Sequence, residues 1–158
     1  MNIFAYMKNP LTGAKLLDYA RQTIAEEELL LKDIQESQWD KGEDKERNVI
    51  GRYKESTQNI AKLARANRPK QKGKRYNLDW SGDLRRKTDI KSKRRDNDVV
   101  VVIDSSSSSL LELFSTIERY GLIRNPNTIF GYNKENLDRV KKIIKKGLKV
   151  KTKQNHGV

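Results

Sequence analysis

A short run of β-branched residues near the middle of the chain constrains the fold more than any other feature. Val99 to Ile103 are all valine or isoleucine, and Asp98 and Asp104 bound the run. A run this short, β-branched throughout and flanked by polar residues, is typical of a strand rather than a helix. Residues 84–90 have a weaker strand pattern, and the intervening 91–97 are typical of a hairpin turn. The sequence therefore predicts an antiparallel pair of strands.

Two helices are predicted before this pair. Apolar residues at helical spacing indicate a first helix over 14–36, although glutamates at 26–28 interrupt its apolar stripe. That stripe consists of Leu17, Ala20, Ile24, Leu31 and Ile34. The polar segment 39–48 contains Gly42 and is expected to be a loop.

The second helix is expected over 55–66, with Ser56 or Thr57 as its cap. Its predicted apolar side consists of Ile60, Leu63 and Ala64.

Two more helices are predicted after the strands. Ser109-Leu110-Leu111-Glu112 fits a capping box, which indicates a helix that ends near Tyr120 and Gly121. The last helix is expected over 133–146, with Asn133 as its cap and Gly147 just beyond its end. Its predicted buried stripe consists of Leu137, Val140 and Ile144. We therefore expect an α+β fold with N-terminal helices, a small antiparallel β-sheet and a C-terminal helix packed on the sheet.

The chain length suits a single domain, which we place at residues 1–148. Only 35% of the residues are hydrophobic and 35% are charged, so the core must be lean. Residues 149–158 are basic and are expected to be a tail that is disordered or that becomes ordered on a partner. The longest apolar runs have about five residues, far below the ~20 that a membrane span requires, so no membrane partner is expected.

Positive charge is concentrated in the centre of the chain. The net charge is +13, but residues 1–61 carry −2, residues 62–95 carry +11 and residues 96–158 carry +4. Proline, glycine and like charges at 67–76 indicate a basic loop or flexible arm. Such a distribution suits DNA or an acidic protein surface as a partner, although a solvated surface would also explain it. The candidate contact residues are Arg68, Lys70, Lys72, Lys74, Arg75, Lys141, Lys142, Lys145, Lys146, Lys149 and Lys151.

The sequence lacks the residue sets from which common active sites are built. It contains no cysteine and no glycine-rich phosphate loop, and its single histidine, His156, lies near the chain end. Acidic residues near the strand ends, such as Asp83 and Asp98, are more readily explained as partners of the surrounding arginines and lysines. We therefore expect no enzyme, no metal site and no cofactor. Tyr76 and Trp80 lie in the basic region and are expected to anchor the core rather than to stack on bases.

Several segments of the chain occur in an order that resembles a known family. They are Asn48–Tyr53 with Gly51 and Tyr53, Tyr76–Leu84 with Ser81, Gly82 and Leu84, the strand at 98–104, Tyr120-Gly121, and Ile129–Leu137 with Phe130 and Gly131. This order, over about residues 39–147, resembles the small neck proteins of tailed bacteriophages, of the head–tail connector or tail-completion type. Within it, Gly82 and Gly121 are expected to allow turns with positive φ, and Leu84 to begin the buried strand face. Phe130 and Tyr132 are expected to pin the last helix onto the sheet.

The resemblance implies a structural virion protein, assembled in the host cytoplasm and located in the neck or tail region of the virion. It would form a homo-oligomeric ring that joins the portal or capsid to the tail. Its partners would be portal, adaptor or tail proteins, with DNA in the channel as a further contact through phosphates. The alternative, from charge alone, is a nucleic-acid-binding protein without sequence preference.

Overall fold

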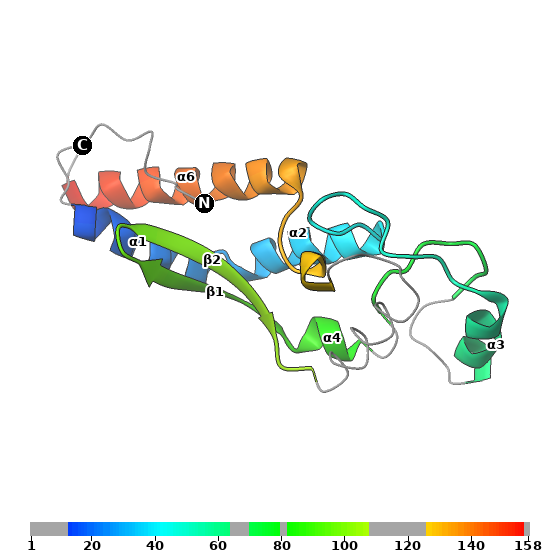
Figure 1. Cartoon of the computed structure of the whole chain (residues 1–158). Coiled ribbons are helices and arrows are strands. Elements are labelled where there is room, and N and C mark those ends of the chain that lie inside the picture. Colours follow the sequence, from blue (N-terminus) through cyan, green and yellow to red (C-terminus); the bar gives the residue numbers. More distant parts are fainter. Residues whose placement is uncertain (1–12, 64–69, 80–81, 108–125, 157–158) are drawn as a thin grey trace.

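The computed structural model describes residues 13–63, 70–79, 82–107 and 126–156, and it has the α+β architecture that the sequence predicts (Figure 1). The helices and strands, in chain order, are α1 (Gly13–Glu26), α2 (Glu28–Asp40), α3 (Glu55–Leu63), α4 (Asp83–Arg86), β1 (Thr88–Arg95), β2 (Asp98–Ser105), the 3-10 helix η1 (Pro126–Ile129) and α6 (Lys134–His156).

The two strands form the predicted antiparallel hairpin. They pair from Thr88↔Ser105 to Arg95↔Asp98, which leaves a turn of only Asp96 and Asn97. Asp96 has a φ of 51°, a conformation that aspartate tolerates in tight turns. The turn is thus shorter than expected, because the polar residues 91–95 continue β1 along an exposed side of the sheet.

The expected start of the first strand is wrong. Residues 83–86 form the short helix α4, and Leu84 is buried from this helix rather than from a strand. Gly82 precedes α4 with a φ of 74°, so the predicted positive φ at this glycine is confirmed. The left-handed glycine turns the chain so that Arg86 N–H donates to the Gly82 carbonyl at 2.9 Å, and a helical turn forms before the strand begins.

The single helix predicted over 14–36 is present as two helices with almost continuous backbone bonding. Glu27 N–H donates to Thr23 O at 3.0 Å, and Leu31 N–H donates to Glu27 O at 2.9 Å. The predicted apolar stripe is buried throughout. The chain stays helical to Asp40, beyond the predicted end, because Trp39 is fully buried and its Nε1 donates to the Ile129 carbonyl at 2.9 Å. Gly42 then ends the helical region with a φ of 66°.

The last helix starts as predicted and ends later. Asn133 caps it by accepting the N–H of Asn136 at 3.0 Å. Gly147 does not end the helix, which continues to His156, so the expected tail from residue 149 is helical over its described part. Leu148 is fully buried, and Lys151 Nζ bonds Glu26 Oε1 at 2.6 Å. These contacts with neighbouring elements explain why the basic end of the helix remains folded.

The side chains pack into two apolar clusters. The larger joins α1, α2, the hairpin and α6, and includes Ile24, Ile90 and Ile144. The smaller surrounds Trp39 and includes Ile50, Leu84 and Ile129. In Figure 1, α6 runs along one side of the molecule with the hairpin beside it, whereas α3 lies at the far end.

Helix α3 contributes little to either cluster. Ala61 is its buried residue, while Ile60 is 56% exposed and Leu63 is 86% exposed. The predicted apolar side is therefore present but not buried among the described residues. The helix begins at Glu55, so Ser56 and Thr57 lie inside its first turn and the predicted cap is wrong. Ala64 to Ala66, and the predicted capping-box helix that ends at Tyr120 and Gly121, lie outside the described residues.

Candidate interaction surfaces

The described part of the central basic segment is a loop held against the chain before α3. Tyr53 N–H donates to Lys74 O at 2.9 Å, Gly73 N–H donates to Tyr53 O at 2.8 Å, and Tyr76 N–H donates to Gly51 O at 2.8 Å. Residues 70–76, the described part of the expected basic loop or arm, thus form a loop whose backbone is bonded to Gly51 and Tyr53. Arg68 lies outside the described residues.

Lys70 holds this loop from inside. The residue is only 2% exposed, and its ammonium donates to Asn77 Oδ1 at 2.9 Å and to the Asp79 carbonyl at 2.5 Å. It also lies 5.7 Å from the centre of the Tyr53 ring. Asn77 Oδ1 accepts the Tyr53 hydroxyl as well, at 2.9 Å, and burial raises the pKa of that hydroxyl. Lys70 is thus a structural cation and not the surface contact that the sequence suggests.

The other basic residues of this loop differ in how far their charge is neutralised. Lys72 Nζ lies 3.0 Å from Glu55, and Arg75 lies 3.2 Å from Glu43. Lys74 is exposed and forms no ion pair within the described part of the chain. The loop at 70–76 is therefore a weaker phosphate-binding surface than its composition indicates.

A second buried cation, Arg85, joins α4 to α2 and was not singled out from the sequence. Its Nη2 donates to Asp40 Oδ1 and to the Asn77 carbonyl, both at 2.7 Å, and its Nη1 lies 3.5 Å from Glu36. The residue is 8% exposed. Nothing in the local sequence distinguishes it from its exposed neighbour Arg86, because its partners lie far away in the chain.

The exposed face of α6 carries many positive charges that few described carboxylates neutralise. From Arg139 to Lys153 the sequence has eight basic residues and no acidic residue. Most of these lie three or four residues apart on the exposed face of α6, within about 20 Å along its axis. They include the predicted contacts Lys141, Lys142, Lys145, Lys146 and Lys149. Lys141 lies 3.8 Å from Asp138, whereas the sixth predicted contact, Lys151, faces Glu26.

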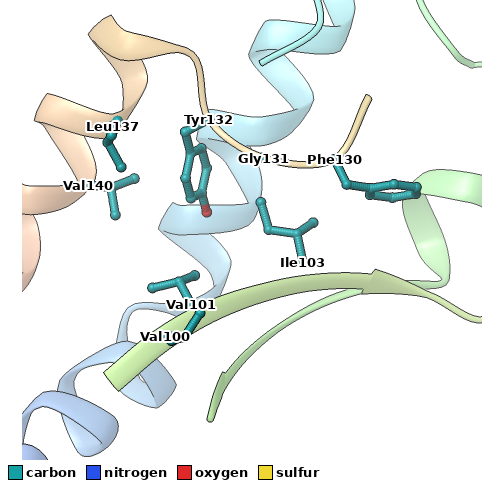
Figure 2. Close-up of a pocket in the computed structure, with 8 residues that line it drawn as sticks. All are labelled: Val100, Val101, Ile103, Phe130, Gly131, Tyr132, Leu137 and Val140. Atoms are coloured by element: carbon teal, nitrogen blue, oxygen red, sulfur yellow. The ribbon is translucent and has the colours of Figure 1, made fainter. Parts of the chain in front are cut away.

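An apolar groove of about 230 Å³ lies between β2 and the start of α6 (Figure 2). It is lined by Val100, Val101, Ile103, Phe130, Gly131, Tyr132, Leu137 and Val140. The Tyr132 side chain lies between the α6 residues and Ile103, and its hydroxyl donates to the Leu31 carbonyl at 3.0 Å. Burial raises the pKa of this hydroxyl, so it remains a neutral donor.

Two glutamines of α2 fix the side of the groove that precedes α6. Gln38 Nε2 donates to Gly131 O at 2.9 Å, and its Oε1 accepts Asn133 N–H at 2.8 Å. Gln35 Oε1 accepts Gly131 N–H at 3.1 Å. Gly131 has a φ of 116°, which requires glycine here. The groove wall is therefore rigidly set by buried polar contacts that the sequence pattern did not predict.

The family-like motif residues occupy structural positions. Gly51 and Tyr53 bond the basic loop, and the Tyr53 ring lies 4.7 Å from that of Tyr76. Leu84 and Phe130 belong to the smaller apolar cluster, where Phe130 meets Trp39 edge to face at 5.9 Å. Tyr132 packs against the larger cluster, which includes residues of the hairpin and α6, whereas Phe130 packs against the smaller one. Ser81, Tyr120, Gly121 and Trp80 lie outside the described residues.

Large apolar side chains are also exposed outside the groove. Besides Ile60 and Leu63 on α3, Leu29 is 79% exposed and Leu30 is 43% exposed at the start of α2. Among the residues that the structure describes, no group of three or more acidic or histidine side chains is placed to hold a metal ion. None of the described helices has the length and apolarity needed to cross a membrane.

Comparison of the chain with protein-family models, with curated proteins and with solved structures finds no match.

Proposed function

We propose that the protein is a structural subunit of a head–tail connector ring, which joins the portal or capsid to the tail of a virion. The observation that carries the proposal is the exposure of large apolar side chains on two separate elements, Leu29 on α2 and Leu63 on α3. A chain with a lean core gains stability when such residues are covered by neighbouring subunits. The order of the neck-protein-like segments supplies the identity of the assembly.

The proposal assigns no catalytic role to the protein. The two buried cations Lys70 and Arg85 bond to neighbouring backbone and carboxylate groups inside the fold. In the proposed ring, the neighbours would be further copies of the chain and portal, adaptor or tail proteins. Assembly would take place in the host cytoplasm, and the finished protein would remain in the neck of the virion.

The test is the mass of the purified protein and its presence in particles. Native mass spectrometry should give one ring of defined mass, and cryo-EM of purified particles should place the protein between portal and tail. Leu63→Asp should break the ring into smaller species, because it charges an exposed apolar residue of α3. Lys62→Asp is the matched control, because Lys62 is exposed on the same helix but lies about 100° around its axis from Leu63, and it should leave the ring intact. A protein that is strictly monomeric and absent from purified particles contradicts the proposal.

The exposed lysines of α6 favour a second candidate function, nucleic-acid binding through phosphates. Their spacing along one helical face would allow several to contact neighbouring phosphates of a duplex. Binding of this kind weakens steeply with salt, because each neutralised phosphate releases a counterion. Duplex DNA binding that is undetectable at moderate salt would exclude this function and leave the ring proposal untouched.

A further inference from the structure

Along one edge of β2, backbone N–H and C=O groups form no hydrogen bond with any described residue. Outside the named strands, Ser106 N–H donates to Lys87 O at 3.0 Å, which continues the ladder by one pair. Because residues alternate along a strand, this bond shows that Asp98, Val100 and Val102 direct their N–H and C=O groups toward β1. Val99, Val101 and Ile103 therefore direct theirs away from β1, toward the groove.

At the end of this edge, a side chain of the strand itself supplies the hydrogen-bond partner for an outward-facing N–H group. Ser105 also faces away from β1, and its N–H donates to the carboxylate of Asp104 at 2.9 Å. No comparable side chain serves Val99, Val101 or Ile103 within the described structure. Three successive outward-facing residues thus form the template that an additional strand requires.

The groove beside this edge suits the side chains of an additional strand. A strand laid against β2 would direct every second side chain toward Tyr132, Leu137 and Val140, which line the groove opposite the edge (Figure 2). Its other side chains would lie beside Val100 and Val102 on the outer surface of the hairpin. The first set must be apolar, since the groove is lined by apolar side chains.

The charge around the groove favours acidic residues among the second set of side chains on the incoming strand. Lys134 and Lys141 are exposed and flank Leu137 on the surface of α6, being three and four residues from it. On the hairpin, Lys93 is exposed and stands directly across from Val100. Acidic side chains on an incoming strand would lie near the two lysines of α6, with Lys93 one strand further away, whereas basic side chains would be repelled by these charges.

We propose that the groove-side edge of β2 binds an extended segment of another protein in which apolar and acidic residues alternate. The segment adds a third strand to the hairpin through the backbone groups of Val99, Val101 and Ile103. A second copy of β2 fits less well: antiparallel pairing centred on Val101 would place Asp98 of one chain opposite Asp104 of the other. The inference goes beyond the ring proposal and does not depend on it.

The probe is a short, acetylated and amidated peptide in which valine and glutamate alternate, titrated into the full chain. We expect saturable binding of this peptide and at least about tenfold weaker binding of its valine–lysine counterpart. The same peptide with N-methyl groups on alternate residues should not bind, because it lacks the N–H donors that pair with β2. No binding of the valine–glutamate peptide, or equal binding of all three peptides, would overturn the proposal.

Two proline variants locate the site on the protein. Val101→Pro removes an N–H that faces the groove and leaves the β1–β2 ladder bonds in place, so it should abolish peptide binding. Ser92→Pro is the matched control, because Ser92 stands directly across from Val101 and its N–H faces away from β2 at the opposite edge. It should bind the peptide like the unaltered protein. Loss of binding in both folded variants, or in neither, contradicts the assignment.

Amide hydrogen exchange of the unaltered protein tests the same edge without a substitution, should either variant not fold. Peptide binding should slow exchange at Val99, Val101 and Ile103, which face the groove, while Val100 and Val102 are already protected by pairing with β1. Slowing confined to other elements would overturn the proposal. A concentration-dependent dimer that Val101→Pro abolishes would identify the occupant as a second copy and would equally overturn it.

Discussion

At the scale of single residues, a glycine on α6 sets how closely two helices pack. A Cβ atom on Gly147 would lie 2.3 Å from Cγ2 of Thr23 on α1, so either the Thr23 side chain or one of the two helices would have to shift. We expect Gly147→Ala to lower the free energy of unfolding by about 1–3 kcal/mol from overpacking. The better helix propensity of alanine offsets about 1 kcal/mol of this loss. Urea unfolding followed by circular dichroism measures the difference.

Thr23→Ala supplies the control for this prediction. It removes the Cγ2 atom in the way and also a buried hydroxyl that has no hydrogen-bond partner in the described structure. In the Thr23→Ala background, Gly147→Ala should lower the free energy of unfolding by less than it does in the unaltered protein, so the two substitutions should couple favourably. Additive effects would show that the Thr23–Gly147 contact does not limit helix packing.

Lys70 provides a second prediction at the residue scale. Lys70→Met retains the length of the side chain and removes the ammonium that bonds Asn77 and Asp79. We expect a loss of about 1–3 kcal/mol in unfolding free energy, because each acceptor loses a buried hydrogen bond from a charged donor. Lys74→Met, at an exposed position of the same loop, is the control and should change stability little. Equal effects of the two substitutions in chemical denaturation would contradict the structural role of Lys70.

At the scale of elements, Asp83 ties the start of the hairpin to its end. Its carboxylate accepts the Ser107 hydroxyl at 2.7 Å and lies 3.0 Å from Lys87 Nζ. These two contacts hold the pKa of Asp83 below its ordinary value of 3.8, and the Ser107 hydrogen bond is the larger cause. The unfolded chain therefore binds this proton more readily than the folded one. The stabilisation is complete above the ordinary pKa and is lost as the pH falls through the lower, folded pKa.

We expect thermal stability to decrease as the pH is lowered below about 4, and Asp83→Asn to reduce this decrease. Ser107→Ala keeps the carboxylate but removes the largest cause of its lowered pKa, so it should reduce the decrease by a smaller amount. Melting temperatures measured by calorimetry across the acid range test both expectations. An unchanged pH dependence in Asp83→Asn would show that this carboxylate does not link the two ends of the hairpin.

The elements also show what local sequence can predict. The hairpin followed from five consecutive β-branched residues, and the α1–α2 stripe from helical spacing, because both patterns are local. The sequence places the end of α6 too early, because Gly147 matches the pattern of a glycine that ends a helix. In the structure Gly147 instead lets α6 pack closely against Thr23, which is more than a hundred residues away in the chain. Likewise, nothing near Leu84 in the sequence indicates that α4 precedes the strand. The groove could not be predicted, since its walls come from β2, residues 130–132 and α6.

At the scale of the whole molecule, the distribution of usable positive charge differs from the distribution of basic residues. The central segment has the highest net charge, yet Lys70 is buried, Lys72 faces Glu55 and Arg75 faces Glu43. The face of α6 has fewer basic residues, but most of them project into solvent with no acidic residue between Arg139 and Lys153. Of these two surfaces, the loop at 70–76 and the face of α6, α6 should therefore bind a polyanion more strongly.

Two triple variants that remove the same number of charges separate these surfaces. If the chain binds duplex DNA, changing Lys141, Lys145 and Lys149 to glutamine should lower the slope of log K against log salt by about one unit for each phosphate that is no longer neutralised. Changing Lys72, Lys74 and Arg75 to glutamine should lower it less, since two of these residues already face a carboxylate. Fluorescence anisotropy at several salt concentrations gives both slopes. A larger decrease from the central triple variant would show that those ion pairs open on binding and that the loop, rather than α6, is the anionic-partner surface.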